Sequence, residues 1–202
     1  RDSVKEVASG VTTMIKGFVG AQAVIGLFQN LVGLLKDGIN TAIKFEEANS
    51  KLAAILGVTA KETKELQAQA RELGATTQYT ADQATNLQIE LAKLGFTMRE
   101  IQDSTKYILL FAQATGSDLA EAASLAGASL RMFDADTVET ERYVSAMAVA
   151  TTKSALSFSY LATALPIVGP VGKSFNFTIE DTLSLLGKLA DSGFDASSAA
   201  TA

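Results

Sequence analysis

The chain carries a motif that ends one helix and starts the next, clearest at Leu94-Gly95-Phe96-Thr97 followed by Glu100. A glycine after an apolar run can adopt the left-handed conformation that closes a helix and satisfies its last carbonyls. The threonine that follows can accept hydrogen bonds from the first free amides of the next helix, while a Glu or Gln three residues later reaches back. Copies occur on both sides of this stretch: Leu56-Gly57-Val58-Thr59 with Glu62, Leu73-Gly74 with Thr80 and Gln83, Thr115-Gly116-Ser117-Asp118, and Ser192-Gly193-Phe194-Asp195.

The motif predicts a serial array of short helices joined by tight corners. Between the corners lie stretches of roughly 14 to 20 residues, close to the usual length of a helix. No stretch of useful length shows strand-like alternation, so the expected fold class is all-α, an array of short capped helices forming a helical bundle. The predicted corner residues are Gly57, Thr59, Gly74, Thr80, Gly95, Thr97, Gly116 and Gly193. The predicted helices are 45–56, 60–73, 81–94, 98–115, 118–132, 137–153, 158–172 and 179–192, with a turn at 169–172 after Pro166 and around Pro170.

The first part of the chain has a different pattern, with an apolar or small residue at every third or fourth position. This period of 3.5 residues is the seam of a left-handed coiled coil, and the flanking positions are apolar too. The broad face favours a three-helix association or packing onto the body of the fold. The predicted oligomerisation seam is Val4, Val7, Val11, Met14, Phe18, Ala21, Ile25, Phe28, Val32, Leu35, Ile39 and Ala42.

Two domains are therefore expected in what reads as a fragment of a longer chain. Residues 1–44 form a long amphipathic, coiled-coil-like helix that precedes the bundle and self-associates as a homo-oligomer. Residues 45–202 form the α-helical core domain.

Composition narrows the possible functions. The 202 residues contain neither His nor Cys, which removes the commonest general base, the commonest transition-metal ligand and the thiolate nucleophile. Asp136 and Glu139 are better explained as the N-terminus of a helix, where negative charge offsets the dipole, than as a catalytic pair. A net charge of −5 disfavours binding to a phosphate backbone. We therefore predict no catalytic, cofactor or metal site and no specific nucleic-acid binding.

Two uncharged stretches, 17–35 and 154–172, are near the minimum length for crossing a membrane. Both contain polar residues, and the second contains two prolines, so burial in a protein core or seam is favoured. A membrane-active helical protein of the pore-forming or effector kind remains the alternative function. A carboxylate-based enzyme that cleaves peptidoglycan is less favoured.

A set of short motifs distributed over the core region carries a family resemblance. It includes Phe45-Glu46-Glu47-Ala48, Ala70-Arg71-Glu72-Leu73-Gly74, Thr77-Gln78-Tyr79-Thr80-Ala81, Leu94-Gly95-Phe96-Thr97, Ala114-Thr115-Gly116 and Leu189-Ala190-Asp191-Ser192-Gly193. In these motifs the core region resembles the tail tape measure proteins of long-tailed bacteriophages and prophages, over roughly 45–202 and most strongly up to about 133. The resemblance implies a non-enzymatic structural protein of the virion tail that sets tail length during assembly and leaves ahead of the DNA at infection. It also implies contacts with the tail tube, the tail tip, tail chaperones and the host membrane.

Overall fold

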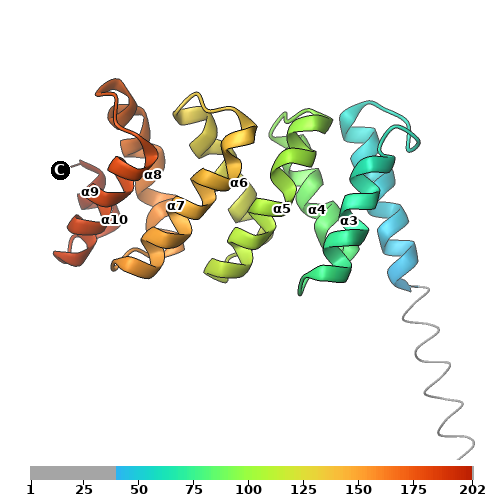
Figure 1. Ribbon diagram of the computed structural model, residues 1–202, viewed down its shortest axis with the longest axis horizontal. Coiled ribbons are helices and arrows are strands. Elements are labelled where there is room, and N and C mark those ends of the chain that lie inside the picture. The colour runs from blue at the N-terminus through green and yellow to red at the C-terminus, as the bar shows by residue number, and fades with distance from the viewer. Residues whose placement is uncertain (1–39, 202) are drawn as a thin grey trace, which may run out of the picture. The chain divides into compact units, whose positions relative to one another are not determined.

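The computed structural model describes residues 40–201 and divides the chain into two units that meet between Glu46 and Glu47. The second unit carries the array of helices, and it begins within a helix that covers 40–56. No strand occurs among the described residues. The elements that follow (Figure 1) are α3 (Lys64–Thr76), α4 (Ala81–Lys93), α5 (Met98–Thr115), α6 (Leu119–Met132), the 3-10 helix η1 (Thr137–Glu139), α7 (Thr140–Lys153), α8 (Phe158–Ser174), α9 (Ile179–Asp191) and α10 (Ala196–Thr201).

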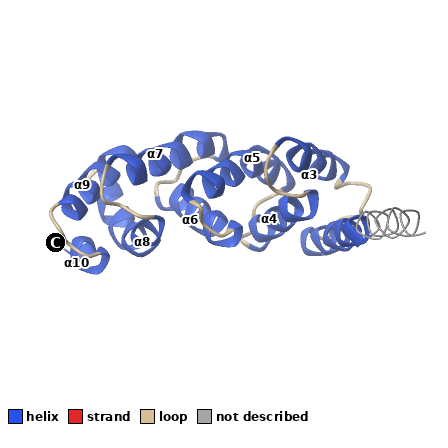
Figure 2. Cartoon of the chain, turned by 90° about the horizontal axis from the view of Figure 1, so that it is seen from below, coloured by secondary structure: helices blue, strands red, loops and turns tan. Residues whose placement is uncertain are grey.

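The labelled helices of this unit lie in two layers, with α3, α5, α7 and α9 in one and α4, α6, α8 and α10 in the other (Figure 2). All the substantial contacts join helices that are one or two places apart along the chain. Helical repeat proteins have the same quasi-one-dimensional packing, in which each element is stabilised by near neighbours only. The predicted all-α bundle is confirmed, and its packing is that of a two-layer array.

Backbone conformations recur along this array at an interval of 77 residues, the distance from 57 to 134 and from 116 to 193. Gly57 and Asp134 both have positive φ, at +68° and +51°. Gly116 and Gly193 are separated in the sequence by the same interval as that first pair, and their φ angles are +68° and +86°. The corners before α3 and α7 are therefore equivalent, and so are the corners before α6 and α10.

Side chains recur at the same interval. Thr63 and Thr140 are fully buried, and each hydroxyl donates to the carbonyl three residues earlier, at 3.1 and 2.5 Å. Thr77 and Ser154 both have extended backbone and both donate to the carbonyl four residues earlier, at 2.7 and 2.8 Å. The array thus contains an internal repeat of two similar four-helix units, in which α3 to α6 correspond to α7 to α10.

The corner between α4 and α5 shows how four intervening residues, 94–97, can reverse the chain. Gly95 has φ +83°, and the next amide, that of Phe96, donates to the carbonyl of Leu91 at 3.1 Å. This bond closes α4 in the Schellman manner. The amide of Thr97 donates to the Glu100 carboxylate at 2.7 Å, and the Thr97 hydroxyl accepts from the Glu100 amide at 3.4 Å. Both helix ends are thereby satisfied within a few residues.

This geometry predicts different costs for two substitutions at Gly95. Asp134 and Asn176 occupy similar corners with φ of +51° and +61°, so Gly95→Asn should be tolerated. Gly95→Val should cost about 1–2 kcal/mol more, because a β-branched residue is strained at positive φ. Urea unfolding of both variants measures the difference. Equal losses of stability would contradict the left-handed assignment.

The prediction that Gly74 ends a helix is wrong. Helix α3 continues to Thr76, and Thr77 closes it through the bond between its hydroxyl and the Leu73 carbonyl. A Cβ on Gly74 would lie 2.6 Å from the backbone nitrogen of Ala81, the first residue of α4. Glycine is required here because two helices approach closely.

The predicted turn at 169–172 is also wrong, because α8 continues through Pro166 and Pro170. Both prolines lie on the exposed face, so the carbonyls that lose an intrahelical partner can bond to water. The opposite face, with Leu161 and Leu165, is fully buried in the array. Tertiary packing therefore outweighs the cost of proline within a helix, which is about 3 kcal/mol per residue.

Two helices begin later than the sequence predicts. The amide of Thr59 donates to the Glu62 carboxylate at 2.7 Å, but α3 begins only at Lys64. Thr59 thus closes a turn that precedes the helix. In the equivalent place the 3-10 helix η1 comes before α7.

Candidate interaction surfaces

The α4–α5 corner is covered by α6. Phe96 is only 5% exposed, and a Cβ on Gly127 would lie 3.3 Å from its ring, so the ring lies against the backbone of α6. One turn further along α6, the Arg131 guanidinium carbon lies 5.2 Å from the Phe96 ring centroid. Arg131 also donates a hydrogen bond to the carbonyl of Leu94. A small residue and a cation on one helix therefore cover this corner.

The α8–α9 corner has the same backbone but leaves its rings exposed. Asn176 has φ +61°, and the amide of Phe177 donates to the carbonyl of Gly172 at 2.9 Å. Phe175 is 70% exposed and Phe177 is 41% exposed, with ring centroids 6.4 Å apart. Exposed Val171 and Ile167, both on α8, lie one and two turns before Phe175. We call the two rings and their backbone the Phe175–Phe177 corner.

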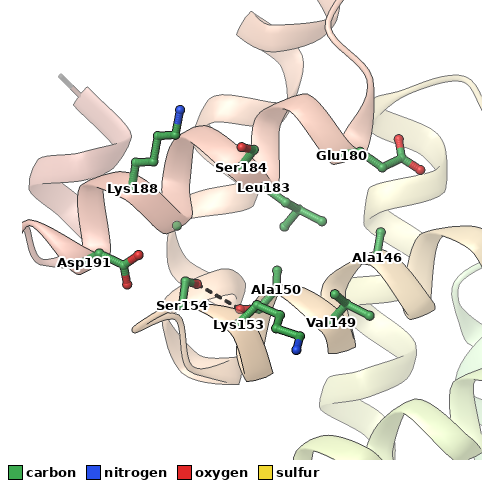
Figure 3. A pocket seen from close by; sticks show the side chains of 11 residues that line it. Ala146, Val149, Ala150, Lys153, Ser154, Glu180, Leu183, Ser184, Lys188 and Asp191 are labelled. Carbon is green, nitrogen blue, oxygen red and sulfur yellow. Dashed lines mark hydrogen bonds between the residues drawn. The ribbon is translucent and has the colours of Figure 1, made fainter.

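A groove of about 370 Å³ lies between α7 and α9 (Figure 3). Val149, Ala150 and Leu183 give it apolar walls. Its two acidic side chains already have partners: Asp191 accepts from the amide of Ala155 at 2.6 Å, and Glu180 binds an arginine. The groove therefore offers apolar surface for packing. The remaining lining residues are Ala146, Lys153, Ser154, Ser184, Gly187 and Lys188.

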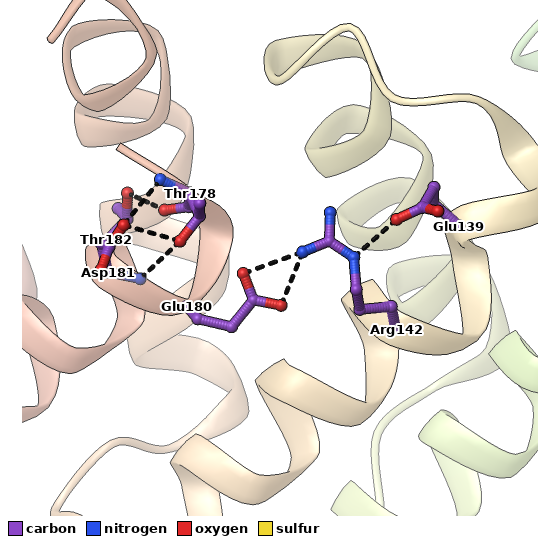
Figure 4. A network of polar contacts seen from close by, with 6 residues as sticks. All are labelled: Glu139, Arg142, Thr178, Glu180, Asp181 and Thr182. Atoms are coloured by element: carbon purple, nitrogen blue, oxygen red, sulfur yellow. Dashed lines mark hydrogen bonds and ion pairs between the residues drawn. The ribbon is translucent and has the colours of Figure 1, made fainter. Parts of the chain in front are cut away.

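Arg142 links α7 to α9 beside this groove (Figure 4). Its Nε donates to Glu139 at 2.6 Å, and its Nη1 donates to both carboxylate oxygens of Glu180 at 2.8 and 3.0 Å. The hydrogen bond that Arg142 donates to Glu139 is the main cause of the raised pKa of Arg142. All three side chains are about half exposed, so each ion pair contributes at most about 1 kcal/mol. The network joins α7 to α9 at the protein surface.

The carboxylates that cap helices predict a loss of stability in acid. Asp181 accepts from the hydroxyl and amide of Thr178 at 2.7 and 3.0 Å, and the hydroxyl is the main cause of its lowered pKa. A carboxylate whose pKa is lower in the folded state than in the unfolded state stabilises the fold at pH values above its unfolded-state pKa. This stabilisation is lost as the pH falls through the folded-state pKa. Glu62 and Asp195 behave alike, their pKa values being lowered chiefly by backbone hydrogen bonds.

We therefore expect the urea midpoint to fall as pH drops from 6 to below 4, and to fall less in Asp181→Asn. The asparagine variant should be less stable than the parent chain at pH 6 and close to it at the acidic end. Replacing Thr178 by valine should weaken the pH dependence in the same way. An unchanged slope in both variants would show that this cap is not formed.

The acidic residues weighed as a catalytic pair serve the fold. Asp136 accepts from the amide of Val138 at 3.0 Å, and Glu139 binds Arg142. Within residues 40–201, no group of three or more potential metal-ligating side chains could hold a metal ion. Over the same residues, no helix is both long enough and apolar enough to cross a membrane.

Most of the predicted oligomerisation seam, from Val4 to Ile39, lies outside the described residues, as does the uncharged stretch 17–35. Ala42 lies in the helix over 40–56 and is exposed. Self-association through residues 1–44, and the domain boundary at 44, stay predictions.

Sequence reasoning missed the Phe175–Phe177 corner and the groove. The corner had a signal, because Phe175-Asn176-Phe177-Thr178 has the form of Leu94-Gly95-Phe96-Thr97 with asparagine in the glycine position. The groove had none, because it forms between helices that the sequence does not show to be neighbours.

Capped corners and packing between near neighbours along the chain define the described part of this protein as a helical array with the packing of helical repeat proteins. More particularly, the chain belongs to the family of phage-related minor tail proteins, whose profile matches residues 67–202. This is a family of structural proteins, and its members are components of phage tails.

Two curated relatives give the comparison more detail. The chain is 30% identical over 196 residues to the tape measure protein of Pneumococcus phage Dp-1, covering 97% of this chain and 17% of that protein. It is 31% identical over 180 residues to the probable tape measure protein of Escherichia phage P2, covering 84% of this chain and 22% of that protein. The chain thus spans about a fifth of their length. No solved structure matches it.

Proposed function

We propose that this chain is a segment of a tail tape measure protein and acts in tail-length determination, tail assembly and genome ejection. The observation that carries the proposal is the alignment of 97% of the chain with the Dp-1 tape measure protein. We infer from the two-layer packing that the two parts of the chain contribute differently to tail length. An extended helical arm measures length efficiently, at about 1.5 Å per residue, whereas an array of antiparallel helices places many residues in little axial distance.

The arm over residues 1–44 is proposed to self-associate along the tube axis. The array is proposed to contact the tail tube, the tail tip and the tail chaperones during assembly, and host-membrane contact would follow during ejection. These roles place the protein in the tail lumen and tip of the virion, and in the bacterial cytoplasm during assembly.

The internal repeat supplies a deletion that tests this proposal. Removing residues 80–156 joins Tyr79 to Ser157, which is the counterpart of Thr80, and so excises one full repeat length, from α4 to α7, at matching corners. As one extended helix these residues would span about 115 Å. Because they fold into an array, we expect tails to shorten by much less than this, and assembly or DNA delivery to be impaired. Electron micrographs of tails give the length.

The matched control removes one heptad from 4–42, which should shorten tails by up to about 10 Å. Unchanged tail length after several such heptad deletions would contradict a role in measuring length. Shortening by the full extended length in the 80–156 deletion would show that the array straightens in the tube.

A further inference from the structure

The two equivalent corners of the array differ in one respect. The α4–α5 and α8–α9 corners share a left-handed residue, at Gly95 and Asn176, and a phenylalanine immediately after it. Phe96 is buried because α6 lies over it, whereas Phe177 is 41% exposed. Apolar rings left exposed at a position where the fold elsewhere places a helix indicate a binding surface.

The helix that corresponds to α6 is α10, and it starts in the same way. Asp118 caps α6 by accepting from two amides at 2.8 and 3.3 Å, and Asp195 caps α10 by accepting from two amides at 3.0 Å. Ala122 and Ala199 each lie four residues after their cap, and both are buried. α10 also packs on α8 and α9, as α6 packs on α4 and α5. The two helices occupy equivalent places.

Of the two residues with which α6 covers its corner, the small residue has a counterpart in α10, whereas the cation has none among residues 40–201. Arg131 lies at the end of α6, and the same distance counted from Asp195 leads to position 208, C-terminal to α10. Helix α9 has 13 residues against 18 in α5. Allowing one helical turn for this brings the counterpart of Arg131 to about position 204 and the counterpart of Gly127 to Ala200 in α10. In Figure 1, α10 ends short of the α8–α9 corner. Among the residues that the structure describes, no cation lies over the ring of Phe177 as Arg131 lies over that of Phe96.

We propose that the Phe175–Phe177 corner is the docking site for a helical segment that continues α10. The extended helix presents Ala200 to the rings and, one turn later, an Arg or Lys that lies over Phe177 and donates to the carbonyl of Phe175. The contact would extend the two-layer array by the same rule that joins α6 to the α4–α5 corner. The proposal concerns packing of the array and does not depend on the role in tail length, so the two tests can fail separately.

A graft tests the site directly. Residues 199–202 are replaced by the sequence of 126–133, which keeps the Asp195 cap and places the residues from Gly127 and Arg131 at positions 200 and 204. We expect the melting temperature to rise by at least about 2–4 °C. Phe177→Ser should change the melting temperature little in the original chain, because the ring is exposed, and should abolish the gain in the grafted chain. The matched control graft carries valine and alanine in place of the residues from Gly127 and Arg131, and should give no gain.

A gain that survives Phe177→Ser, or that the control graft also gives, would overturn the proposal. If the graft does not raise the melting temperature, hydroxyl-radical footprinting tests the docking site instead. It compares the labelling of Phe175 and Phe177 in the 202-residue chain with their labelling in a longer tape measure chain that contains it. Labelling of Phe175 and Phe177 should fall several-fold in the longer chain, while Leu110 on α5 serves as the exposed reference. Equal labelling of the two rings in both proteins would overturn the proposal.

Discussion

Leu109→Ala is expected to destabilise the array by about 2–5 kcal/mol, the range for truncating a fully buried leucine. Leu109 on α5 is 0% exposed, and α5 contacts helices on both sides of it along the chain. The cavity would open at the centre of the array, where neighbouring helices cannot collapse without separating from their other partners. Equilibrium urea unfolding measures the loss.

The adjacent residue provides the control. Leu110 is 42% exposed in the same helix. Leu110→Ala therefore makes the same truncation at a surface position, and it should lower the free energy of unfolding by less than about 1 kcal/mol. Similar losses at both positions would mean that α5 is not packed in the described orientation.

Gly74→Val is expected to cost about 3 kcal/mol or more, because added volume forces backbone shifts. Any Cβ at this position would lie 2.6 Å from the nitrogen and 3.0 Å from the Cα of Ala81. Both are backbone atoms at the start of α4 and cannot rotate away, so α3 and α4 would have to separate.

Ala75→Val is the matched control, since Ala75 is exposed on the same helix. It carries the helix-propensity cost of valine, about 0.5 kcal/mol, without the clash. A thermal melt in which both variants behave alike would show that Gly74 is a simple helix position and that the close approach is not formed.

The corners explain how one fold is maintained by different residues. Gly57 and Asp134 hold equivalent left-handed positions, and Thr80 and Ser157 cap equivalent helices. Each substitution keeps the property that the corner needs, either tolerance of positive φ or a side-chain oxygen that accepts from free amides. The internal repeat is therefore visible in backbone geometry and burial, and barely visible in residue identity.

The sequence by itself determined the helical class and most of the corners. A left-handed closing residue such as Gly95 and a cap such as Thr97 act through bonds that span at most five residues, so their physical effect can be read locally. The absence of His and Cys and the family resemblance were likewise properties of the chain alone.

Tertiary structure decided the features that depend on contacts between distant segments. Gly74 reads as a helix end but lies within α3, because only the approach of α4 makes its missing Cβ necessary. Pro170 reads as a turn but lies within α8, because the buried face of that helix stabilises it. Phe96 and Phe177 follow equivalent left-handed residues, yet one is covered and the other exposed, since α6 reaches its corner and α10 ends before the corresponding one.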